Sequence, residues 1–194
     1  MQMKSILIAG VGGQGTLLTS MVLGQIALKL NYDVKLSEVH GMAQRGGSVV
    51  TYVRIGDKGE RVYSPVIDEC GADILLAFEE LECLRWLPYL KKQDGKVYCN
   101  TQHILPMPVI TGAMEYPKDA EQMIRTHFKD AVFVDALAIA NEVCNVKTVN
   151  TVLLGVLAKH MDISKEVWID AIRLVVKPKF ADMNEKAFML GYNL

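Results

Sequence analysis

The chain has 194 residues, of which 51% are hydrophobic, and its 21 basic and 22 acidic side chains give a formal net charge of -1. This balance, without a long Lys/Arg run, argues against a nucleic-acid ligand, because binding a phosphate backbone needs a concentrated basic surface. The apolar stretch from Ile6 to Ala9 is too short for a signal peptide or a membrane span, so we expect a cytoplasmic protein without membrane contact. The hydrophobic fraction is high for this charge content, which indicates a large core or an apolar surface that meets a partner.

The first third of the chain alternates short apolar runs with glycine-rich turns. An apolar run that ends in glycine is typical of a strand buried on both faces, and apolar residues at helical spacing follow it. A β-branched run, a turn rich in Gly and Asp, and a second short run then predict an antiparallel hairpin. The predicted elements are strands at residues 4–9 and 33–37, a helix that ends near residue 31, and a hairpin of residues 49–55 and 61–63 around a turn at 56–60.

The remainder of the chain continues the alternation and then turns wholly helical. The predicted strands are residues 72–78, 96–100 and 131–135, and the predicted helices are one that contains Leu81, Leu84 and Leu87 with Pro88 in its last turn, then 120–128, 136–143, 152–160, 164–176 and 181–192. Ser164 is a candidate N-cap for the helix that follows it. We therefore predict one domain, residues 1–194, of three-layer α/β/α architecture. It has a mostly parallel Rossmann-like sheet, an antiparallel hairpin excursion and a helical part from about 136 to 194.

The first candidate site is the glycine-rich turn after the first strand, Gly10-Val11-Gly12-Gly13-Gln14-Gly15. It matches G-x-G-x-x-G between a strand and a helix, where glycines let backbone N–H groups approach an anion. Glu38 lies near the spacing at which an acidic residue would bind the ribose of NAD or FAD. The alternative is that these glycines only permit a tight turn and close packing against a partner chain.

The second candidate site is the loop Glu38-Val39-His40-Gly41-Met42-Ala43-Gln44-Arg45-Gly46-Gly47-Ser48. Arg45 can hold a phosphate or carboxylate, His40 can donate to an anion or shuttle a proton, and Gln44 can orient either. Alternatively, His40 is structural and Arg45 pairs with Glu38. No nucleophile or second base accompanies them, so we assign no catalytic residue. Both glycine-rich loops are predicted to follow strand ends at the same edge of the sheet, where ligands gather in open α/β sheets.

Other candidate residues favour structural roles. The four cysteines, Cys70, Cys83, Cys99 and Cys144, form no C-x-x-C pair, and the histidines have no metal-ligand spacing, so we expect reduced thiols and no metal site. Asp135 is expected to cap a helix rather than to act as an acid. The segment with Pro106, Pro108 and Gly112 is an interface, a lid or a mobile loop.

Taken together, these motifs resemble the gamma-type subunits of the 2-oxoacid:ferredoxin oxidoreductase family. The residues that carry the resemblance are GVGGQG at 10–15, EVHGMAQRGGSV at 38–49, ADILLAFEE at 72–80 and NTVLLG at 150–155. Within that family the chain is most similar to the small subunits of the indolepyruvate-oxidising members. The resemblance covers nearly the whole chain, and the H-G-M-A-Q-R-G-G string is far more specific than the glycine fingerprint.

The resemblance implies a non-cluster subunit, inactive alone, of an enzyme that oxidatively decarboxylates an aryl 2-oxoacid to an acyl-coenzyme A and reduces ferredoxin. Pyruvate, 2-oxoisovalerate and 2-oxoglutarate are alternative substrates. Thiamine diphosphate, magnesium and iron–sulfur clusters are then expected in a large partner subunit, and the isolated chain is a possible homodimer. The residues expected at the cofactor side are Gly10, Gly12, Gly13, Gln14, Gly15, Thr16, His40, Gln44, Arg45, Gly46, Gly47 and Ser48. A free-standing NAD- or flavin-binding reductase and a purely scaffolding subunit are the rival hypotheses.

Overall fold

A computed structural model describes residues 4–43, 46–143 and 145–194, and its centre is a six-stranded sheet of order β2-β3-β1-β4-β5-β6. The strand β1 is apolar from Ile6 onward and buried on both faces from Ser5 onward, which requires layers on both sides of the sheet. The strands are β1 (Lys4–Val11), β2 (Val34–His40), β3 (Ser48–Ile55), β4 (Ile74–Ala77), β5 (Lys96–Asn100) and β6 (Val132–Val134).

The sheet is mixed. The strands β1, β4, β5 and β6 are parallel neighbours, whereas β3 pairs antiparallel with both β1 and β2. An antiparallel hairpin is therefore present, but the prediction that it joins residues 49–55 to 61–63 is wrong. β3 has β1 on one side and β2 on the other, so no ladder position is left for residues 61–63. Val62 donates its N–H instead to the carboxylate of Asp33, at 2.8 Å.

The second strand is longer than the sequence predicted. Glu38, Val39 and His40, which we placed in a loop, pair with Thr51, Val50 and Val49 of β3. The loop at the candidate site is thus the short connection of the β2–β3 hairpin, and it begins at Gly41.

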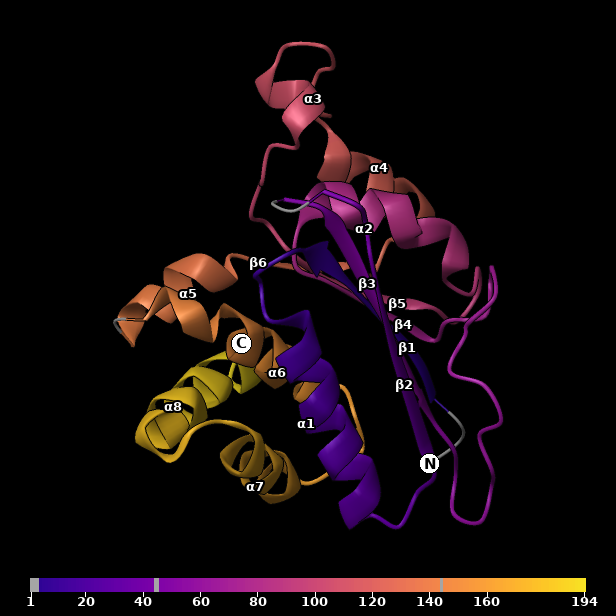
Figure 1. Cartoon of the computed structure of the whole chain (residues 1–194), viewed down its shortest axis with the longest axis vertical. Helices are drawn as coiled ribbons and strands as arrows, with labels where there is room; N and C mark the ends of the chain where they lie inside the picture. Colours follow the sequence, from indigo (N-terminus) through magenta and orange to yellow (C-terminus); the bar gives the residue numbers. More distant parts are fainter. Residues whose placement is uncertain (1–3, 44–45, 144) are drawn as a thin grey trace.

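Helices cover both faces of the sheet, which confirms the three-layer prediction (Figure 1). Alternate residues of β1 divide between two cores: Ile6 and Ile8 face the layer of α1 and α5 to α8, while Leu7 and Ala9 face α2 and α4. The helices are α1 (Thr16–Lys29), α2 (Glu80–Trp86), α3 (Met107–Ile110), α4 (Ala120–His127), α5 (Ala136–Glu142), α6 (Val149–Lys159), α7 (Lys165–Val175) and α8 (Ala181–Tyr192). Short 3-10 turns are η1 (Leu87–Tyr89), η2 (Val146–Thr148) and η3 (Pro178–Phe180).

Helix termini test two of the predictions. Asp135 caps α5, because its carboxylate accepts the N–H of Ala138 at 2.9 Å. Ser164 is the N-cap residue of α7, as predicted, but its side chain makes no capping hydrogen bond there. Within the described residues, no helix is long and apolar enough to cross a membrane.

Candidate functional site

The two glycine-rich loops meet at one edge of the sheet. β1 and β2 both run antiparallel to β3 and therefore point the same way, so the loops that follow them emerge together. The N–H of Gly12 donates to the carbonyl oxygen of Gly47 at 3.0 Å, and the N–H of Gly41 donates to that of Ser48 at 2.7 Å. This confirms the prediction of a shared edge and joins the loops into one surface.

Different structural constraints require glycine at different positions of the first loop. Gly13 and Gly15 adopt φ values of 96° and 87°, in the left-handed region that side chains disfavour. Gly15 also packs against α6, where an added Cβ would lie 2.8 Å from Nδ2 of Asn150. Gly12 and Gly13 are exposed to solvent. The loop therefore presents bare backbone outward and is closely packed beneath.

Gln14 closes this turn from within. Its Oε1 accepts the N–H of Val11 at 2.7 Å, and its Nε2 donates to the carbonyl oxygen of Phe78 at 3.0 Å. The amide therefore bridges the ends of β1 and β4, and an added Cβ on Gly10 would lie 2.9 Å from its oxygen. Gln14 has its hydrogen bonds within the chain, which favours a positioning role over direct ligand contact.

The carboxylate of Glu38 also has its polar contacts within the chain. It accepts from the hydroxyl groups of Thr51 at 2.8 Å and Thr16 at 3.2 Å, and it pairs with Nε2 of His40 at 2.8 Å. In a dinucleotide-binding fold the second strand adjoins the first, whereas here β3 lies between them. Both observations argue against Glu38 as a ribose ligand, and they give His40 the structural partner that the sequence left open.

The second loop is tight and exposed. Gly46 has a φ of 68°, and a Cβ on Gly47 would lie 2.7 Å from the carbonyl oxygen of Ala43. Met42 is fully exposed. Ser48 donates to the carboxylate of Glu82, which also pairs with Arg85 at 3.2 Å. Gln44 and Arg45, both predicted site residues, lie outside the described residues.

A buried carboxylate behind the site was missed at the sequence level. Glu79 accepts from the N–H of Ile104 at 3.2 Å and from the hydroxyl of Tyr116 at 2.5 Å. Burial, followed by the contact with Glu79, raises the pKa of Tyr116. Glu79 thereby fastens both ends of the segment 104–116, which carries α3 and stands out beyond α2 and α4 (Figure 1).

Asn100 is a second missed residue. It is fully buried at the end of β5, where it donates to the carbonyl oxygen of Phe78 at 3.1 Å and accepts the N–H of Ala136 at 3.0 Å. The signal in the sequence is a polar residue that ends an otherwise apolar strand. Asn100 thus fixes the ends of β4 and β5 next to Gln14.

The first helix presents an apolar rim that begins beside the loops and continues along the helix. Leu17, Met21 and Leu28 are 53%, 46% and 59% exposed, while polar residues of the same helix are buried. These buried polar residues are Thr16, Thr19 and Ser20. Val39 and Met42, at the end of β2 and in the loop, are exposed as well. An apolar surface that borders exposed backbone is typical of a protein-contact region.

The backbone here can hold an anion, and no candidate group of metal ligands occurs in the described part of the chain. The N–H groups at the start of α1 have no intrahelical acceptor, and no side chain caps Gly15. Among the described residues, no three His, Cys, Asp or Glu side chains are grouped as metal ligands. Cys83 and Cys99 are buried, and a hydrogen bond with Cys83 together with burial raises the pKa of Cys99. The described cysteines therefore do not fit an iron–sulfur cluster.

Comparison with protein families gives one match over almost the entire chain. The model of the pyruvate ferredoxin/flavodoxin oxidoreductase family matches residues 5–194. The indolepyruvate oxidoreductase subunit IorB of Pyrococcus horikoshii is 43% identical, over 98% of this chain and 95% of that protein.

Solved structures show the same fold. The pyruvate oxidoreductase subunit PORC of Thermotoga maritima superposes with a TM-score of 0.74 at 22% identity, over 100% of this chain and 97% of that one. The 2-oxoglutarate:ferredoxin oxidoreductase of Magnetococcus marinus, solved with 2-oxoglutarate, coenzyme A and succinyl-CoA bound, gives a TM-score of 0.72 at 17% identity. The match covers 100% of this chain but 31% of that one, so the fold also occurs as one part of a longer polypeptide.

Proposed function

This chain belongs to the pyruvate ferredoxin/flavodoxin oxidoreductase family, and we propose that it is the small subunit of a 2-oxoacid:ferredoxin oxidoreductase. The complex would oxidatively decarboxylate an aryl 2-oxoacid such as indolepyruvate to an acyl-coenzyme A and pass the electrons to ferredoxin. Thiamine diphosphate, magnesium and the iron–sulfur clusters would be held by a large partner subunit. The substrate class follows the relative from Pyrococcus horikoshii.

One observation carries the proposed role of the loops: they are bonded to each other through Gly12 and Gly47 and present exposed backbone. Bare backbone N–H groups at the start of a helix suit an anionic group such as a phosphate or a carboxylate. We therefore propose that the loops complete a composite site, with these N–H groups and Arg45 holding an anion of the cofactor or of coenzyme A.

The apolar rim supports docking of the partner at the same place. Leu17 is the second residue of α1, directly after the glycine turn, Val39 lies at the end of β2, and Met42 lies in the second loop. Exposed apolar side chains around a backbone surface are expected to be buried when a partner closes over them. The longer relative, in which this fold is one part of a chain solved with coenzyme A, is consistent with such an arrangement.

A free-standing NAD- or flavin-dependent reductase is less well supported. Glu38 already binds Thr16, Thr51 and His40, and the strand that should adjoin β1 is displaced by β3. If the isolated chain bound a dinucleotide, and if that dinucleotide raised its melting temperature, the result would support this rival hypothesis.

Assembly can be tested with Leu17→Asp, produced together with the large subunit. The side chain is exposed and an acidic residue suits the first turn of a helix, so the isolated fold should survive. We expect copurification of the large subunit to be lost. Leu174→Asp, at an exposed position of α7, is the matched control and should leave copurification intact.

The anion role can be tested with Arg45→Ala and His40→Ala in the assembled enzyme. We expect Arg45→Ala to raise the KM for oxoacid or coenzyme A by about tenfold, the size of one lost charged contact, and His40→Ala to act less. If both variants leave assembly and both KM values unchanged, the loop is only a connection and the chain is a scaffold.

Three expectations from the sequence remain proposals. We propose that residues 1–194 form one domain, supported by a single family match over residues 5–194. A cytoplasmic location and a homodimer of the isolated chain stay predictions from the sequence.

A further inference from the structure

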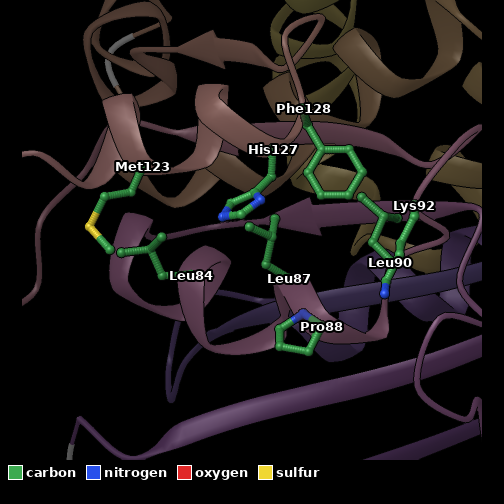
Figure 2. A pocket seen from close by; sticks show the side chains of 8 residues that line it. All are labelled: Leu84, Leu87, Pro88, Leu90, Lys92, Met123, His127 and Phe128. Carbon is green, nitrogen blue, oxygen red and sulfur yellow. The ribbon is translucent and has the colours of Figure 1, made fainter.

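An apolar cavity of about 630 Å³ lies away from the glycine-rich loops, between the α2–η1 stretch and the end of α4. Figure 2 shows its side chains facing one another from the two sides. Its apolar lining is contributed by Leu84, Leu87, Pro88, Leu90, Met123 and Phe128.

The cavity has the character of a ligand pocket. Its volume falls in the range of about 300–1,000 Å³ that is usual for small-molecule sites, and its lining is mostly apolar with few polar groups. Leu90 is buried and forms part of the core between the sheet and α2, while Leu84, Leu87 and Phe128 are half-buried. These half-buried side chains hold apolar surface that this chain does not cover.

One end of the cavity is positively charged. Lys92 and His127 line it and also line an adjoining cleft of about 100 Å³, to which Lys96 and Lys129 belong. Asp130 is the one carboxylate among the described residues that line these two spaces, so the lysines outnumber it. An apolar hollow that opens onto a cluster of ammonium groups is complementary to a molecule with an apolar body and an anionic head.

We propose that this cavity binds a small organic carboxylate with an aryl or alkyl body. The body would lie against Leu84, Leu87 and Phe128, and the carboxylate would meet Lys92, with His127 beside it. The site lies where β5 begins, at the edge of the sheet opposite the glycine-rich loops, and its binding does not depend on the function proposed for them.

Calorimetric titration of the full chain, alone and in complex with the large subunit, tests this proposal. The probe is 2-naphthylacetate, its uncharged isostere is 2-naphthylacetamide, and acetate tests the anionic head alone. We expect saturable binding of one 2-naphthylacetate in both preparations, about tenfold tighter than the amide, and little binding of acetate.

Two variants locate the ligand. Lys92→Glu changes an exposed residue. It should weaken the binding of 2-naphthylacetate about tenfold and leave the affinity for 2-naphthylacetamide unchanged. Lys58→Glu makes the same change of charge at an exposed turn outside both spaces and should have no effect. Circular dichroism of both variants checks that the fold is intact.

Three results would overturn the proposal. Absence of saturable binding shows that the cavity has no such ligand. Equal affinity for acid and amide, unchanged by Lys92→Glu, shows apolar adsorption only. Binding to the isolated chain that disappears in the complex assigns the cavity to the subunit interface.

Discussion

The helices α1 and α6 lie in the same layer, and both are apolar around most of their circumference. All ten residues from Val149 to Ala158 of α6 are buried, because α8, α5, α1 and β5 surround it. In α1 the side toward β3, α6 and α7 is buried, but Leu17, Met21 and Leu28 face outward. The same kind of sequence is thus covered within the chain in one helix and left uncovered in the other.

The difference shows where the chain is incomplete by itself. A helix that is apolar all round is normally buried on all sides. Other elements of the chain bury α6 on all sides, whereas α1 would be buried on all sides only if a partner covered its outer side. The uncovered side begins at Leu17, next to the two glycine-rich loops where the composite site is proposed, and continues along the helix to Leu28. The following experiments contrast the two helices first and then the regions next to them.

The largest expected effect is that of one glycine in α6. In Gly155→Ala the new Cβ would lie 2.1 Å from the backbone carbonyl oxygen of Phe188, so α6 and α8 must separate. We expect a loss of about 3 kcal/mol or more in the free energy of unfolding, or no folded protein. Urea unfolding followed by circular dichroism measures it.

Gly24→Ala is the matched substitution in α1. Its Cβ would meet only Cδ1 of Leu36, at 3.2 Å, and that side chain can move because it is partly exposed. Alanine favours a helix by about 1 kcal/mol over glycine, so the variant should equal or exceed the wild type in stability. A loss similar to that of Gly155→Ala would show that α1 is packed as tightly as α6.

Truncating a leucine is expected to lower the free energy of unfolding more in α6 than in α1. Leu154→Ala removes a fully buried side chain of α6 and should cost about 2–5 kcal/mol. Leu17→Ala removes an exposed one and should stay within about 0.5 kcal/mol in the isolated chain. Equal losses in urea unfolding would contradict the idea that the outer side of α1 is uncovered in the isolated chain.

Removing the hydrogen bond between Tyr116 and Glu79 should lower the free energy of unfolding by about 1 kcal/mol. Tyr116→Phe removes the hydroxyl that Glu79 accepts at 2.5 Å and loosens one end of the segment 104–116. We expect a lower urea midpoint and faster cleavage of this segment by a protease. Tyr63→Phe, at an exposed position, is the control; if both variants are cleaved at the wild-type rate, Glu79 does not fasten the segment.

The smallest expected effect is a dependence of stability on pH through His160. Burial, with Lys159 and Lys96 nearby, lowers the pKa of His160 below its ordinary value of 6.5 in the folded chain. The unfolded state therefore binds the proton more readily, so stability falls as the pH drops below 6.5 toward the folded pKa. His160→Gln should remove this contribution to the loss of stability at acidic pH, whereas His127→Gln should leave the contribution of His160 in place. Unfolding free energies measured across that pH range decide between them.

Several features of the fold could be predicted because they depend on local pattern. The run before Gly10 is apolar without alternation, which is typical of a strand covered on both faces, and β1 is such a strand. Pro88 was expected to kink or restart the last turn of its helix, and the chain continues there as the 3-10 turn η1. The shared edge of the two glycine-rich loops followed from the direction of their strands.

Other features depended on partners distant in the sequence. The hairpin was assigned to residues 49–55 and 61–63 because both runs suit strands, but strand propensity does not choose between competing neighbours. Pairing with β2 extended that strand to His40, and Asp33 held residue 62 instead. Glu79 and Asn100 gave weak local signals, since the partners that make them important, Phe78, Ile104, Tyr116 and Ala136, each lie more than 20 residues away.

By itself, the sequence determined the alternation of buried strands with helices, the edge at which the glycine-rich loops lie, and the family resemblance, because these follow from periodicity, turn chemistry and motif. Only the tertiary structure decided that Gln14 and Glu38 are occupied within the chain, that Leu17 and Met21 face outward, and that a cavity opens beside Lys92. The physical reason is that hydrogen bonding and burial are properties of pairs of residues brought together by folding. Sequence spacing fixes which side chains can share a face of one element, but not which other element covers that face.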